Sequence, residues 1–191
     1  KTSTWMRVVS PGVSVELPFS HSLMRIGYNL SLRKYSIADS RWIDTHTALF
    51  DLDLAFGNGT AVTVHDDFHL GILDNPVGAP GSELPFQQNY QANAAEVFVG
   101  HERAGHHQLG VRFRSLSTTY LQPVFGSYFN EDAWSVAALG NWHVGPRTWL
   151  VWEAQGGTAN LDRANPSPTL DNTRVEDELS VLVGAGWELS T

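Results

Sequence analysis

The chain has 191 residues, about the length of one domain. Its 12 Lys and Arg stand against 20 Asp and Glu, a formal net charge of −8 at pH 7, which argues against a protein that binds the phosphates of nucleic acid. There is no Cys, which excludes disulfides, thiolate metal sites and cysteine nucleophiles, and no apolar run approaches the roughly 18 residues of a membrane-spanning helix.

Apolar and polar residues alternate with a period of two over most of the chain, as they do in a β-strand with two unlike faces. The window Leu23–Tyr35 shows this most clearly. The alternation predicts nine strands, in chain order Trp5–Leu17, Leu23–Tyr35, Thr45–Phe56, Ala61–Ile72, Gln91–His101, Gln108–Tyr120, Trp134–Val144, Thr148–Thr158 and Val175–Leu189. No amphipathic helix is expected.

The length of these runs distinguishes two kinds of β protein. Many have 11 to 14 residues, whereas strands of soluble proteins usually have about 5–6 residues. A membrane-spanning strand tilted near 45° needs about 9–11. We therefore expect an all-β fold, an antiparallel up-and-down transmembrane β-barrel formed by residues 1–191 as a single domain.

The connections between the predicted strands alternate between short and long. Short ones lie near residues 19–22, 57–60, 102–105 and 145–147, and long ones cover about 36–44, 73–90, 121–132 and 159–174. Outer-membrane barrels have short periplasmic turns and longer extracellular loops. In that orientation the first strand runs inward from the outer rim. Since bacterial barrels normally have an even number of strands, we expect an incomplete barrel that lacks at least one upstream strand.

Four segments in the first part of the chain follow the order of a known family. They are Ser10-Pro11-Gly12 within residues 8–15, the Tyr-containing run 27–35, His46–Asp51, and His65-Asp66-Asp67-Phe68. This order resembles the outer-membrane β-barrel proteins that accompany bacterial exopolysaccharide export and exosortase gene clusters. The resemblance covers roughly residues 8–72. It implies a bacterial outer-membrane location, a strand preceding the Ser-Pro-Gly segment, and a route or support for a secreted polymer, and it carries no catalytic residues.

The two parities of the strands predict two environments. In a barrel the apolar parity faces lipid and the polar parity faces the lumen. The expected lumen-lining residues are Arg25, Asn29, Ser31, Arg33, Arg112, Arg114, Asn141, His143, Glu176 and Glu178. The expected lipid-facing residues are Met24, Ile26, Tyr28, Leu30, Leu32, Trp134, Trp142, Val181, Val183 and Trp187.

One group of acidic and histidine residues could bind a divalent cation or hold an acid–base pair. It consists of Asp51, Asp53, His65, Asp67 and His69. Pairing two strands around the turn signal Asn58-Gly59 predicts Asp53 opposite His65 and Asp51 opposite Asp67. The alternative is a hydrated polar stripe of cross-strand His–Asp pairs.

These patterns lead to one expected function and two alternatives. We expect a porin-like outer-membrane barrel of the Gram-negative envelope that is not an enzyme, acting as a pore or scaffold and linked to polysaccharide export. Its expected partners are outer-membrane lipid and other envelope or export proteins, with no nucleic acid and no cofactor. The alternatives are an outer-membrane enzyme with a lumenal Asp/His site and a soluble β-sandwich binding module.

Overall fold

The computed structural model describes residues 6–35, 42–75, 86–103, 107–121, 130–145, 147–162 and 173–187. These ranges form ten strands, β1 (Met6–Val9), β2 (Gly12–Phe19), β3 (Ser22–Tyr35), β4 (Ile43–Ala55), β5 (Thr60–Asn75), β6 (Phe86–Arg103), β7 (His107–Tyr120), β8 (Glu131–Gly145), β9 (Thr148–Asp162) and β10 (Thr173–Trp187). Among these residues no helix is long and apolar enough to cross a membrane.

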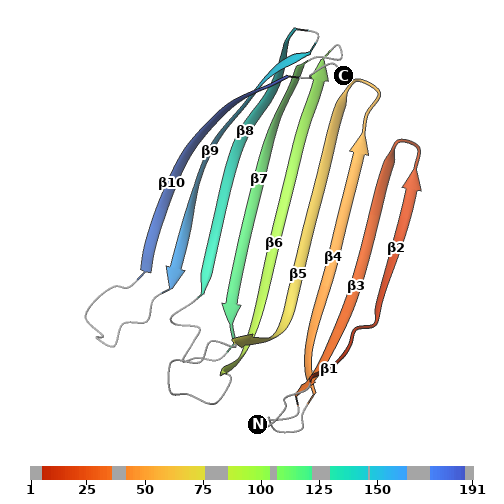
Figure 1. Cartoon of the computed structure of the whole chain (residues 1–191), viewed down its shortest axis with the longest axis vertical. Helices are drawn as coiled ribbons and strands as arrows, with labels where there is room; N and C mark the ends of the chain where they lie inside the picture. The colour runs from red at the N-terminus through yellow and green to blue at the C-terminus, as the bar shows by residue number, and fades with distance from the viewer. Residues whose placement is uncertain are drawn as a thin grey trace.

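All ten strands belong to one antiparallel sheet, in which each strand from β2 onward pairs with the next along the chain (Figure 1). β1 and β2 both pair with β3, and their registers continue one another: Val9 lies opposite Leu32 and Gly12 opposite Asn29. They therefore form one strand that is interrupted at Ser10 and Pro11. Proline has no backbone N–H to donate, so a break at this edge of the sheet suits it.

The connections that follow β2, β4, β6 and β8 have two to four residues, and because neighbouring strands are antiparallel they all lie at one end of the sheet. The turn at Asn58-Gly59 joins β4 to β5 as the sequence predicts. Gly59 has a φ of 84° and donates a hydrogen bond to the Phe56 carbonyl. A side chain at Gly59 would meet the Glu102 carbonyl oxygen at 2.4 Å, so both its φ and its surroundings require glycine. The longer connections fall largely outside the described residues.

The sheet is a single layer. Within the described ranges only two apolar residues are buried, Ile43 and Ala137, and no polar residue is. A β-sandwich would cover one face with a second sheet, but all the described strands lie in this one sheet, whose strands curve together (Figure 1).

The sheet is open, with β2 at one edge and β10 at the other. The sequence prediction of an all-β, antiparallel, up-and-down fold is confirmed, and its nine strands become ten because the first is divided. β2 and β10 run in the same direction, since eight antiparallel steps separate them. An all-antiparallel closure of this sheet would therefore need an odd number of further strands between them.

A substitution at Gly157 tests how tightly β8 and β9 pack. An added side chain there would meet the Trp134 carbonyl oxygen at 2.4 Å and Ser135 Cβ at 2.7 Å. Its neighbour Gly156 is a matched control, because an added Cβ there would have nothing nearer than 3.8 Å. We expect Gly157→Ala to lower the free energy of unfolding by about 1–3 kcal/mol through overpacking, and Gly156→Ala to leave it nearly unchanged. Urea unfolding followed by tryptophan fluorescence measures both, and equal effects would contradict the packing described here.

Candidate functional site

The polar parity of the strands forms one continuous face, which we call the polar face. Directly opposed residues of antiparallel strands point to the same side of a sheet. Successive pairings therefore place one row of side chains across the whole polar face. This central row consists of Glu16, Arg25, Asp51, His65, Glu96, Arg114, Ser135, Gly157 and Glu178.

Over the first six positions of this row, acidic residues alternate with arginine or histidine, and most of these neighbours contact one another. Arg25 Nε donates to Glu16 Oε1 at 2.8 Å, and Arg25 Nη1 lies 3.5 Å from Asp51 Oδ2. The other carboxylate oxygen of Asp51 lies 2.5 Å from His65 Nδ1. Arg114 Nε donates to Glu96 on β6, which lies directly opposite His65 on β5. A chain of polar contacts thus links β2 to β5, and a second joins β6 to β7.

A further ion pair crosses β8. Arg112 on β7 donates to Glu153 on β9, and both side chains are largely screened from solvent. Between these strands Ala137 faces Arg112 and is only 2% exposed. Because the side chain of Ala137 is only a methyl group, Arg112 has room to extend over β8 and reach Glu153 on β9.

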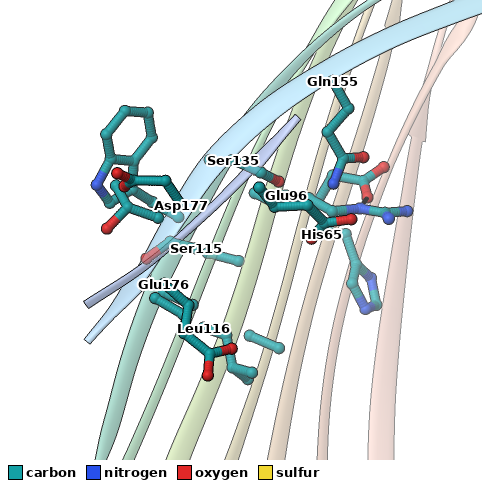
Figure 2. Close-up of a pocket in the computed structure, with 17 residues that line it drawn as sticks. His65, Glu96, Ser115, Leu116, Ser135, Gln155, Glu176 and Asp177 are labelled. Atoms are coloured by element: carbon teal, nitrogen blue, oxygen red, sulfur yellow. Dashed lines mark hydrogen bonds and ion pairs between the residues drawn. The ribbon is translucent and has the colours of Figure 1, made fainter. Parts of the chain in front are cut away.

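Three hollows of the surface are lined mainly by residues of the polar face. One has a volume of about 560 Å³, and most of its lining residues belong to polar-face positions, including His65, Glu96, Arg114 and Gln155. Figure 2 shows Gln155, Glu96 and His65 on one side of the β9 and β10 ribbons, and Asp177 on the other. Two smaller hollows are lined mainly by polar-face residues as well, one near Asn29 and one near Asn141. The polar face is therefore the one with room for solvent or solute.

The opposite parity forms what we call the apolar face. All the residues expected to line a lumen lie in polar-face positions: Arg25, Asn29, Ser31, Arg33, Arg112, Arg114, Asn141, His143, Glu176 and Glu178. The residues expected to face lipid lie in apolar-face positions: Met24, Ile26, Tyr28, Leu30, Leu32, Trp134, Trp142, Val181, Val183 and Trp187. The side chain of Trp187 lies outside the described part of the chain.

The acidic and histidine group is arranged differently from the expected register. Asp51 lies opposite His65 and Asp53 opposite Thr63, so the predicted pairing was wrong by two residues. All five members still share the polar face, because a shift of two residues preserves the parity. The four-residue turn, which is longer than a two-residue hairpin turn, sets this register.

The group divides into two pairs. Asp51 contacts His65, and Asp67 Oδ2 lies 3.2 Å from His69 Nε2, while Asp53 makes neither contact. His69 Nδ1 is also 3.2 Å from Thr47 Oγ1. In the described ranges no group of three or more His, Cys, Asp or Glu could hold a metal ion. Asp51 and His65 form a cross-strand pair, whereas Asp67 and His69 are two residues apart on β5, and both pairs belong to a polar stripe.

One polar cluster on the apolar face was not foreseen from sequence. Tyr28 Oη lies 2.6 Å from His46 Nδ1, and His46 Nε2 lies 3.1 Å from Asp44 Oδ2. Asp44 and His46 lie near the long-connection end of β4, and Tyr28 reaches His46 from the middle of β3. Only the register brings Tyr28 within reach of His46, so alternation alone could not reveal it.

Comparison with family models, curated proteins and solved structures finds no match to this chain. The resemblance to exopolysaccharide-associated barrels stays a prediction from sequence motifs.

The two arginine pairs of β7 should differ in strength. Side chains of the Arg112–Glu153 pair are 19% and 28% exposed, whereas those of the Arg114–Glu96 pair are 53% and 31% exposed. Solvent screens exposed pairs more strongly, so we expect a coupling energy of about 1 kcal/mol or more for the first and about 0.5 kcal/mol or less for the second. Double-mutant cycles with Gln at both positions, measured by urea unfolding, give these values, and a stronger Arg114–Glu96 coupling would contradict the assignment.

Proposed function

We propose that the chain forms part of the wall of a bacterial outer-membrane β-barrel. Its apolar face contacts the hydrocarbon of the bilayer, and its polar face lines a water-filled lumen. The barrel acts as a passive pore or scaffold in an envelope complex. The motif resemblance of residues 8–72 supports a link to polysaccharide export.

The exposure of the apolar face is the observation that carries this proposal. Val15 is 51% exposed, Phe113 42%, Trp142 57% and Val181 71%. These positions lie on strands from one edge of the sheet to the other. Soluble monomers rarely expose contiguous apolar patches larger than a few hundred Å², and larger ones mark contact with a membrane or a partner. A face of this extent supports a lipid contact.

The shape of the apolar area supports a tilted arrangement of the strands. Met24 on β3 and Phe113 on β7 belong to one cross-strand row, through Leu52, Val64 and Val97. From this row the apolar positions of β3 extend to Leu32, toward the long connections, whereas those of β7 extend to Leu109, toward the short ones. The apolar area therefore crosses the rows diagonally. Strands of a membrane barrel tilt by about 35–45°, which requires such a diagonal.

Strand length agrees with the same arrangement. β3 to β10 have 13 to 18 residues each. Thirteen residues at about 3.3 Å each span roughly 43 Å. Tilted near 45°, such a strand covers roughly 30 Å along the membrane normal, which is the thickness of the hydrocarbon layer.

The polar face supports a solvated lumen. Arg25, Arg112 and Arg114 are held by carboxylates, as charged groups need to be where a barrel wall limits their contact with bulk water. The hollow of about 560 Å³ near Glu96 lies on this face. A lumen that conducts solutes would act as a pore, and one occupied by a partner would act as a scaffold.

A pair of neighbouring residues on β8 tests which face meets lipid. Val136 lies on the apolar face and Ser135 on the polar face. Arginine on the lipid face of a membrane barrel costs about 2–4 kcal/mol near the bilayer midplane. We therefore expect Val136→Arg to lower the free energy of unfolding in phospholipid vesicles by about that amount, and Ser135→Arg to change it far less.

Chemical unfolding of the full chain in vesicles measures both variants. Two results would contradict the proposal: a chain that stays in the aqueous phase without detergent, or a Ser135→Arg variant that loses more stability than Val136→Arg.

A further inference from the structure

The charges of the polar face indicate which ions the lumen would favour. We infer that the pathway along this wall prefers cations to anions. This inference rests on the proposed pore and adds to it the charge class of the solute.

The middle of the polar face carries more carboxylates than guanidinium groups. The three arginines there, Arg25, Arg112 and Arg114, each contact at least one carboxylate. Arg25 contacts two, because it lies between Glu16 and Asp51 in the central row. The positive charge of these side chains is therefore largely compensated within the wall, and little of it is left to attract anions from solution.

Further carboxylates lie on the same face beyond these pairs. Asp53 lies in the row that contains Arg112, and Glu178 in the central row. Neither makes an ion pair with another described residue. Arg33 also lies on the polar face, nearer the long connections, so the surface that remains for a passing ion is negative in the middle of this face.

Several carboxylates of the polar face line one of its hollows, where a passing ion would come close to them. Glu176 and Glu178 line the hollow of about 560 Å³ together with Glu96, and Arg114 in the same hollow is bound to Glu96. Charges of one sign that line a concave, low-dielectric wall raise the local concentration of counter-ions. Rings of Asp and Glu side chains confer cation selectivity in this way.

The full-length protein in a planar phospholipid bilayer under a KCl gradient tests this inference. The reversal potential gives the ratio of K⁺ to Cl⁻ permeability. At about 0.1 M salt, where the Debye length is about 10 Å, we expect a ratio of about 3 or more in favour of K⁺. At about 1 M salt, where the Debye length falls to about 3 Å, the ratio should approach one.

Two double variants identify the charges responsible. Asp53→Asn with Glu178→Gln removes two carboxylates from the polar face and should lower the permeability ratio at least twofold. Asp66→Asn with Asp132→Asn removes the same charge from apolar-face positions on β5 and β8, and neither residue lines the hollow near Glu96. This control should leave the ratio unchanged.

Three results would overturn the inference. A conducting channel with a ratio at or below one contradicts it and leaves the proposed pore intact. An equal response to the two double variants would assign the selectivity to net charge and not to the polar face. A folded, membrane-inserted protein that does not conduct would exclude both the pore and the selectivity.

Discussion

The structure depends on how its apolar face is covered. A single antiparallel sheet of long strands presents one face rich in Val, Leu, Phe and Trp, and within the described residues nothing from the chain packs on it. Apolar surface in water is unfavourable by roughly 25 cal/mol per Å², so a sheet of this size needs an apolar environment to be stable. In the proposed membrane barrel, the bilayer would supply one over the apolar stretch of each strand. The single layer and the long strands then have one common explanation.

On the polar face the constraint is the opposite one, because its charged groups must be kept solvated or paired. Charged side chains on a wall with limited solvent need partners, and antiparallel register places such partners directly opposite one another. Glu16, Arg25 and Asp51 show this arrangement, in which one guanidinium group joins three strands. Small residues serve the same purpose: Ala137 leaves room for Arg112 to reach Glu153 across β8. The ion pairs therefore link strands side by side and also leave the face hydrophilic.

Much of the fold could be predicted from the period of the sequence, because side chains alternate strictly across a strand. Leu23–Tyr35 reads as a strand directly, and its two sets of residues lie on two faces as expected. Contacts between strands could not be predicted in the same way, since they depend on register. The turn near Gly59 has four residues, so Asp51 and not Asp53 meets His65. For the same reason the contact of Tyr28 with His46 and the reach of Arg112 to Glu153 have no signal in a single sequence.

The most direct measurement of which face meets lipid uses the absence of native cysteine in the chain. Single cysteines at successive positions from 24 to 32 on β3 would each carry a fluorophore, with the protein inserted in vesicles that contain a lipid-borne quencher. The account predicts quenching that alternates along the strand, strong at Met24, Ile26 and Leu30 and weak at Arg25 and Asn29. Quenching without alternation, or stronger at the polar positions, would contradict it.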